Sequence, residues 1–346
     1  MTWKSMRVIV AFAAGAAGLA AQQPANPPLP EPLESYIRKY VKLDARGLAD
    51  LHAGRPVSRL LESDPAREVG VMGAVWINAM PAAYAAAVRG IEQFEKGPSF
   101  RATKKVSAPP RLDDFAAMTI PDEDFRDLRN CRVGQCSLKL TQPTIDRIRR
   151  DIDFSKPAAK AAVETMMRQL ALDYVTAYIE GGNVRLAVYR DSERPTFVAE
   201  ETRSMIQNLP SLTEFLPDLR RYLLDYPGAT LPGSDSFIYW QETQFGLKPT
   251  IRINHVVITE QPTQVVVASK MLYASHYFWT ALELRVLVSD PARGRGSWFV
   301  SVNRSRSDGL SGFTGRLIRG RVRSEAQNGM TAILRVTKER LEAPSK

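Results

Sequence analysis

The residues best suited to chemistry lie together in one segment, Lys270 to Trp279, which places a histidine among several aromatic side chains. If this segment is a strand, Tyr273, Ser275 and Tyr277 share one face, because successive side chains of a strand alternate. His276 then points to the opposite face, where it is the candidate general base or hydrogen-bonding contact for a ligand. The alternative is a core histidine that holds a backbone carbonyl.

A second histidine, His255, lies between Ile253 and Val257 in an alternating pattern typical of a strand. It would line the same interior if the two segments share a sheet, although a structural role is again the alternative. The expected ligand-binding residues are Trp240, His255, Tyr273, His276, Tyr277 and Trp279.

Several kinds of catalytic and cofactor site are excluded by the absence of their motifs. The sequence contains no Gly-x-Ser-x-Gly elbow, His-Glu-x-x-His pair, phosphate loop or dinucleotide glycine motif. The acidic run from Asp113 to Asp127 lacks the spacing of a calcium loop and favours a helix start instead. We therefore expect no metal and no cofactor, and an enzyme is only the second hypothesis.

The two cysteines, Cys131 and Cys136, are expected to form a disulfide, since the sequence offers no other thiol. A redox-active pair is the alternative, but the spacing is not Cys-x-x-Cys. A disulfide suits an oxidising compartment.

The N-terminus has the pattern of an export signal. Lys4 and Arg7 precede an apolar stretch that ends in small residues, which predicts a cleaved signal peptide over residues 1–21. An uncleaved anchor is the alternative, but the apolar stretch is short for a membrane span. Residues 22–32 are rich in proline and predict a linker. The protein is thus expected in the periplasm or outside the cell.

Hydrophobic periodicity divides the rest of the chain into helical and strand-forming parts. Residues 33–61 show helical spacing, 67–80 alternate like a strand, and 81–94 form a helix that begins at a proline. Residues 144–226 are mostly helical, with a strand at 184–189. Successive strands are predicted at 236–245, 250–259, 263–271, 277–289 and 297–302, followed by one long helix over 315–341.

Serial strands with short connections favour an antiparallel sheet. The closing helix should lie on that sheet through an apolar stripe, because an exposed sheet face needs a covering layer. The residues expected in the stripe are Ile318, Val322, Gly329, Ile333 and Leu341.

This order of elements resembles the helix-grip fold of the StAR-related lipid-transfer and polyketide-cyclase superfamily. The matching pieces are the strand 69–77, the helix 81–94, the strands within 236–302 and the helix 315–341. The resemblance implies an α+β fold in which a curved antiparallel sheet wraps the terminal helix and encloses an apolar cavity. Residues 33–346 would form this domain, with a helical insertion at about 144–226.

The chain also resembles a family of uncharacterised secreted bacterial proteins. The shared segments are 131–136, 268–278 and 303–310, which read CRVGQC, ASKMLYASHYF and NRSRSDGL. This second resemblance implies no activity.

The net charge of +10 requires a separate explanation. Arg316, Arg319, Arg321 and Arg323 cluster at the start of the closing helix, and export makes nucleic acid an improbable partner. An anionic membrane surface fits better, because each basic group near it contributes about 1 kcal/mol. A solvated helix face is the alternative.

Three functional hypotheses follow. The first is an exported protein that binds or carries an apolar small molecule or lipid in an internal cavity. The second is an enzyme on the same scaffold with His276 or His255 as acid or base. The third is a structural envelope protein without a sizeable cavity.

Overall fold

The structure is a computed structural model that describes residues 27–246, 248–310 and 312–343. The predicted signal peptide, 1–21, and residues 22–26 of the predicted linker lie outside these ranges. Leu29 is already buried in the core, and helix α1 (Glu31–Tyr36) begins two residues later. The last part of the proline-rich segment therefore belongs to the folded body.

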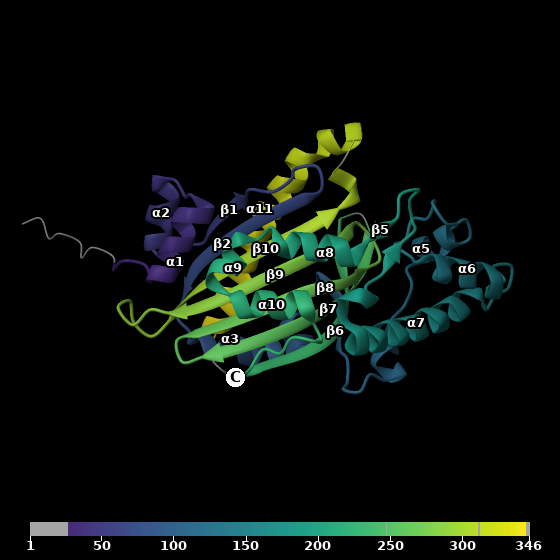
Figure 1. Cartoon of the computed structure of the whole chain (residues 1–346), viewed down its shortest axis with the longest axis horizontal. Helices are drawn as coiled ribbons and strands as arrows, with labels where there is room; N and C mark the ends of the chain where they lie inside the picture. The colour runs from purple at the N-terminus through teal and green to yellow at the C-terminus, as the bar shows by residue number, and fades with distance from the viewer. Residues whose placement is uncertain (1–26, 247, 311, 344–346) are drawn as a thin grey trace, which may run out of the picture.

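The core of the fold is an eight-stranded sheet in the order β1-β2-β10-β9-β8-β7-β6-β3, with every neighbouring pair antiparallel. Helices cover both faces of this sheet (Figure 1). The predicted α+β fold, with a curved antiparallel sheet packed on a long C-terminal helix, is confirmed. The strands are β1 (Val57–Leu61), β2 (Glu68–Ile77), β3 (Phe100–Lys105), β6 (Ser234–Phe245), β7 (Lys248–Gln261), β8 (Gln264–Ala274), β9 (Phe278–Ser289) and β10 (Ser297–Ser307).

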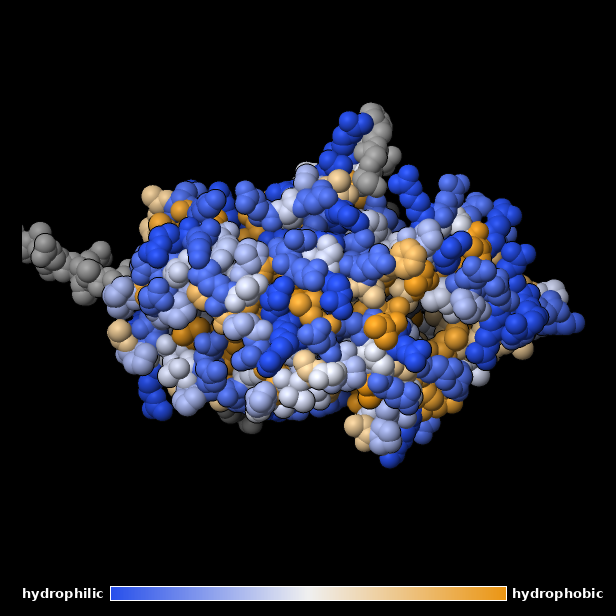
Figure 2. All heavy atoms as spheres, in the orientation of Figure 1, coloured by the Kyte–Doolittle hydropathy of each residue, from blue (hydrophilic) through white to orange (hydrophobic). Residues whose placement is uncertain are grey.

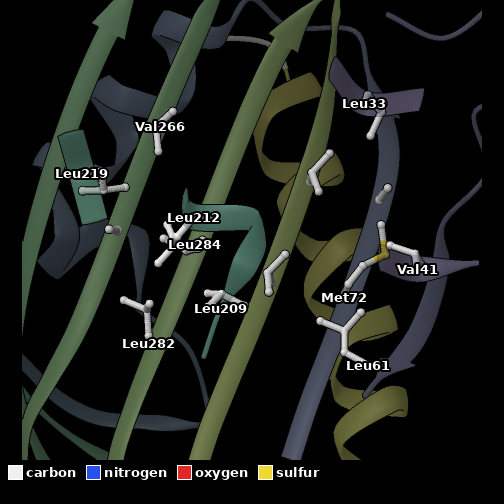
Figure 3. Packing of buried hydrophobic residues seen from close by; sticks show 14 of the residues in the cluster. Leu33, Val41, Leu61, Met72, Leu209, Leu212, Leu219, Val266, Leu282 and Leu284 are labelled. Carbon is white, nitrogen blue, oxygen red and sulfur yellow. The ribbon is translucent and has the colours of Figure 1, made fainter. Parts of the chain in front are cut away.

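One face of the sheet, which we call the first face, is covered by the helices α8 (Val198–Gln207), α9 (Pro210–Phe215) and α10 (Pro217–Asp225). Figure 3 shows leucines of the α8–α10 segment packed over aliphatic residues of β8 and β9. Each fully buried aliphatic side chain contributes about 2 kcal/mol. The N-terminal helices α1 and α2 (Ala45–His52) extend this layer toward β1 and β2.

The opposite face, the second face, is covered by α3 (Pro81–Arg89), α4 (Ile91–Phe94) and the C-terminal helix α11 (Gly312–Glu342). Helix α11 crosses β2 at Gly73. A Cβ atom added there would lie 2.7 Å from Met330 Cγ and 2.8 Å from Leu334 Cδ1. The helix therefore packs directly onto β2 at this point.

The stripe of α11 that faces the sheet differs from the predicted one. Met330, Leu334 and Thr337 are buried, whereas Ile318 and Ile333 are 39% and 41% exposed. The helix has two apolar stripes, and the close approach at Gly73 selects the one that contains Met330 and Leu334. The prediction that Ile318 and Ile333 face the sheet is therefore wrong, whereas Leu341, also predicted for the stripe, packs against the buried cluster on the second face.

Two local predictions are also wrong. Residues 57–61, expected to be helical, form the edge strand β1, which pairs with β2. The predicted strand over 184–189 is extended only at β4 (Val188–Tyr189), because residues 184 and 185 belong to a 3-10 turn, η3 (Gly182–Arg185). Gly182 has φ +65°, and a Cβ atom there would lie 1.8 Å from the Tyr226 carbonyl oxygen, so a close tertiary contact fixes this turn.

The predicted helical insertion contains α6 (Gln142–Asp151), α7 (Ala159–Gly181), a small two-stranded sheet of β4 (Val188–Tyr189) and β5 (Thr196–Phe197), and the helices α8 to α10. Helix α5 (Asp122–Leu128) precedes it and is followed by the predicted disulfide between Cys131 and Cys136, which is present. Within the described ranges, no helix is long and apolar enough to cross a bilayer.

Candidate ligand-binding site

Three adjoining pockets lie around the segment from α5 to α7 and beside the sheet. We name them the tyrosine pocket (around Tyr174 and Tyr273), the histidine pocket (around His276 and Tyr277) and the disulfide pocket (around Cys131 and Cys136). Lys139 lines both the tyrosine and the histidine pocket. The histidine and disulfide pockets in turn share Cys136, Ser137 and Asp191.

The tyrosine pocket has a volume of about 360 Å³ and a mostly apolar lining. Its wall on α7 follows from helical spacing, because positions 167, 170, 171 and 174 fall on one face of the helix. The opposite wall comes from the first face of the sheet. The lining residues are Met118, Lys139, Leu140, Thr141, Pro143, Thr144, Met167, Leu170, Ala171, Asp173, Tyr174, Ala187, Ile251, Ile253 and Tyr273.

The two tyrosines that name the pocket pack against each other, and Tyr174 also joins α7 to the sheet. Tyr174 donates its hydroxyl hydrogen to the Leu272 carbonyl oxygen at 2.6 Å, which fixes α7 to β8. The rings of Tyr174 and Tyr273 lie edge to face with centroids 6.3 Å apart. Both side chains thus line the pocket within a fixed aromatic wall. In Figure 2, hydrophobic residues reach the surface in the region of α7.

The histidine pocket has a volume of about 380 Å³ and is lined mainly by residues with polar or charged side chains. The segment 270–279 is not one continuous strand, since β8 ends at Ala274 and β9 begins at Phe278, which agrees with the gap between the predicted strands 263–271 and 277–289. His276 lies in the intervening bend, where its Nε2 is 2.9 Å from Asp124 Oδ2 and its Nδ1 is 3.1 Å from the Ser137 carbonyl oxygen. Both ring nitrogens therefore face oxygen atoms of the protein, and these two contacts fix the orientation of the ring.

The bend also contains Tyr277, which is not a glycine and yet has φ +63°. Such a conformation is unusual for an aromatic residue and is found at sites where the surrounding structure enforces it. The Tyr277 hydroxyl accepts a hydrogen bond from the Lys248 backbone N–H at 2.9 Å. The start of β7 therefore helps to hold the bend that positions His276.

Two lysines of the histidine pocket are held by carboxylates. Lys139, almost completely buried, has its Nζ 2.8 Å from Asp308 and 3.1 Å from Asp191. Lys248 Nζ lies 2.7 Å from an oxygen of Asp127 and 3.2 Å from one of Glu123.

Around Lys248 the carboxylates dominate the electrostatics. Partial burial lowers the pKa of Lys248, but the hydrogen bonds to Asp127 and Glu123 outweigh that penalty and raise it overall. The hydrogen bond from Lys248 lowers the pKa of Asp127. Of the carboxylates that pair with these two lysines, only Asp191 and Asp308 line the histidine pocket, so two lysines and two aspartates balance in its wall.

The disulfide pocket has a volume of about 770 Å³. Its rim is the loop closed by Cys131 and Cys136, which is bound to the segment after β4. Gly134 N donates to the Arg190 carbonyl oxygen at 2.8 Å, and Cys136 N donates to that of Asp191 at 2.9 Å. The disulfide thus stabilises the loop that borders both polar pockets.

The other predicted ligand-binding residues lie elsewhere. Trp240 is completely buried in the core and donates Nε1–H to the Asp114 carbonyl oxygen at 2.9 Å. Trp279 lies against the Arg67 guanidinium, 5.4 Å from the ring. Neither tryptophan is among the residues that line the three pockets.

His255 belongs to a buried cluster that also contains Lys270, its partner across β7 and β8. Tyr178 Oη lies 2.9 Å from His255 Nδ1, and Tyr222 Oη lies 3.5 Å from Nε2. Burial, and secondly the charge of Lys270, lower the pKa of His255 to about 3. The histidine is therefore neutral at physiological pH.

Lys270 is fully buried, and its Nζ donates to Asn183 Oδ1 at 2.7 Å and points toward the rings of Tyr178 and Tyr226. Burial lowers the pKa of Lys270 to about 7. Among the described residues no carboxylate forms an ion pair with it. This cluster joins the helical insertion to the sheet. None of its residues lines any of the three pockets described above.

Sequence reasoning missed Lys139 and Lys248, which lie far from His276 in the chain and carry no motif. Asp124 was visible only as part of an acidic run, and its role as the partner of His276 depends on the fold. Within the described ranges no group of three or more histidine, cysteine or acidic side chains is placed to hold a metal ion.

No known protein-family model matches this chain, and a search of curated proteins finds no similar protein.

Proposed function

We propose that this protein binds an amphiphilic small molecule or lipid, with the apolar part of the ligand in the tyrosine pocket and its polar part in the histidine pocket. The observation that carries the proposal is that Lys139 lines both the tyrosine pocket and the histidine pocket. An apolar pocket and a pocket of polar residues therefore lie side by side. The site lies between α7 and the first face of the sheet, and so not beneath the C-terminal helix as the helix-grip resemblance implied.

The size and lining of the tyrosine pocket support an apolar occupant. Small-molecule sites have volumes of roughly 300–1,000 Å³ and mainly apolar walls. Each methylene removed from water contributes about 0.8 kcal/mol, so a short hydrocarbon segment supplies several kcal/mol before the costs of association.

The charge of the histidine pocket favours a particular kind of polar group. Its two lysines are already neutralised by carboxylates, which leaves little positive charge for an anionic head group. Carboxylate oxygens accept hydrogen bonds and attract cations. Because lysines and carboxylates balance in the lining, the polar part of the ligand is expected to be an uncharged, hydroxyl-rich group.

The test combines ligand identification with a pocket-filling variant. Purified protein is incubated with a lipid extract, re-isolated, and analysed by mass spectrometry. Leu170→Trp should fill the tyrosine pocket and abolish retention of the ligand. Thr165→Trp, an exposed position on the same helix, is the matched control and should retain it. Equal retention by both variants, or no bound amphiphile in the wild type, would refute the proposal.

A second candidate function is an enzyme, and the hydrogen bond between His276 and Asp124 beside a pocket favours it. A histidine oriented by a carboxylate is a common general acid or base. Any retained amphiphile should then be converted by the wild type and left unchanged by His276→Gln. Identical mass spectra for the two proteins over prolonged incubation would leave binding as the better description.

We also place the protein in the periplasm or outside the cell. The disulfide between Cys131 and Cys136 supports this location, because disulfides persist in oxidising compartments. N-terminal sequencing of the exported protein tests it, with cleavage after Ala21 as the expected result.

A further inference from the structure

Helix α11 exposes large hydrophobic side chains in two groups, one near its start and one in its second half. Leu317 is 70% exposed, and Ile318, Ile333 and Val336 are 39%, 41% and 43% exposed. These four are a large share of the ten exposed large hydrophobic residues in the described chain. Single exposed hydrophobic residues are ordinary, but several on one helix indicate an interaction surface.

The exposed residues form a stripe and are not scattered around the helix. Positions 318, 322, 333 and 336 are separated by intervals that keep them on one face, whereas Leu317 lies about 100° around the helix from Ile318. This stripe, which we call the outer stripe, is distinct from the stripe of Met330 and Leu334 that packs on the sheet. Helix α11 is therefore apolar on two faces, and only one of them is covered.

Polar contacts on the inner side hold α11 against the sheet. Gln327 Nε2 donates to the Ser58 carbonyl oxygen at 2.8 Å, and Lys338 Nζ donates to that of Trp76 at 2.8 Å. Arg340 donates to the carbonyl oxygens of Phe94 and Lys96. These hydrogen bonds hold α11 in place on the sheet. The outer stripe can therefore contact a flat partner without movement of the helix.

The charge of the helix identifies the partner. Seven basic residues and three acidic residues lie between positions 312 and 342, and Arg321 and Arg335 are exposed. Arg319, one of the four arginines predicted to meet a membrane, instead donates to the Leu310 carbonyl oxygen at 2.7 Å. An apolar stripe with exposed arginines beside it is the pattern of a helix that lies in the interface of an anionic membrane.

We propose that the outer stripe of α11 docks on an anionic lipid surface, with Ile318, Ile333 and Val336 inserted among the lipids and Arg321 and Arg335 near the head groups. A second copy of the chain is a poorer partner, because a two-fold contact through this face would bring the same arginines toward each other. The inference does not depend on the pocket binding a ligand.

Docking would also bring the candidate site toward the lipid. The chain enters α11 through the short turn Asp308–Leu310, and Asp308 lines the histidine pocket. The start of the docking helix and the polar pocket are therefore close in the structure, as expected if an amphiphile is exchanged with the membrane.

Co-sedimentation of the full chain with vesicles tests the docking surface. We expect binding to vesicles of phosphatidylcholine with phosphatidylglycerol, weak binding to phosphatidylcholine alone, and a loss of affinity as salt rises. Arg321→Gln and Arg335→Gln should each weaken partitioning about fivefold. The pair Ile318→Ser and Ile333→Ser should reduce it by at least tenfold, since two buried aliphatic contacts are lost.

The matched control combines Leu112→Ser with Arg149→Gln, which changes an exposed hydrophobic residue and an exposed arginine away from α11. It should bind vesicles like the wild type. Wild-type affinity in the stripe variants, an equal loss in the control, or no preference for the anionic vesicles would overturn the proposal. A dimer that the Ile333→Ser variant dissociates, without vesicle binding by the wild type, would assign the stripe to self-association. Because all these positions are exposed, circular dichroism should show folded variants.

Discussion

The Nε2 atom of His276 lies 2.9 Å from Oδ2 of Asp124, although 152 residues separate them in the chain. Both side chains are 4% exposed, so this hydrogen bond joins α5 to the bend between β8 and β9 in a nearly dry environment. Its energetic value can be measured independently of any ligand.

A double-mutant cycle at this pair should show strong coupling. Asp124→Asn and His276→Gln are each expected to lower the free energy of unfolding by about 2 kcal/mol, because each removes a hydrogen bond to a charged group. The double variant should lose less than the sum of the two, by about 1–2 kcal/mol. Urea denaturation at neutral pH measures all four proteins. Additive losses would mean that the two side chains do not stabilise each other.

Lys270 should make the free energy of unfolding depend on pH in the alkaline range. Its pKa is about 7 in the folded protein, against an ordinary value of 10.5, because burial penalises the charged amine. Between these values the unfolded chain binds a proton that the folded chain does not, so the free energy of unfolding rises with pH.

The measurement compares the wild type with Lys270→Met, which cannot titrate at this position. The difference in free energy of unfolding should shift in favour of the wild type from pH 7 to pH 10, by at most about 1.4 kcal/mol per pH unit. Below pH 7 Lys270 is protonated in both the folded and the unfolded chain. Its titration should therefore leave the difference in free energy of unfolding between the two proteins constant there. Parallel curves over the whole alkaline range would show that Lys270 stays protonated in the folded protein.

Gly73 should be required for the seating of α11. Gly73→Val places a side chain where Met330 and Leu334 now lie within 3 Å of the Cβ position, so it should lower stability by about 1–3 kcal/mol. Gly320→Ala is the control, because a Cβ there meets no atom within 4 Å and alanine favours a helix. Thermal melts should show a lower Tm for the first and an unchanged or higher Tm for the second. A neutral Gly73→Val would mean that the helix moves away at little cost.

Removal of the disulfide should destabilise the protein modestly. Replacing Cys131 and Cys136 by serine restores freedom to a short loop of the unfolded chain, at an expected cost of about 2 kcal/mol. The wild type in the presence of a reductant should melt at the temperature of the serine variant. A wild-type Tm that reductant leaves unchanged, with reduction verified by thiol labelling, would contradict a stabilising role.

Fold class was accessible from the sequence because it depends on local patterns. Alternating segments such as 282–288 define strands through their own period, and Pro81 marks the start of α3 without reference to the rest of the chain. The disulfide followed from composition, since the chain has only two cysteines. His276, Tyr273 and Tyr277 were identified from their unusual local composition, and each lines a pocket.

What the sequence left open depends on contacts between distant segments. Lys139 and Lys248 meet at the histidine pocket, and Asp124 contacts His276 there, only because the sheet and α5 bring their segments together. The choice between the two apolar stripes of α11 was made by the absence of a side chain at Gly73, more than 200 residues earlier. A helical period states which residues share a face, but only packing against a partner decides which face is buried.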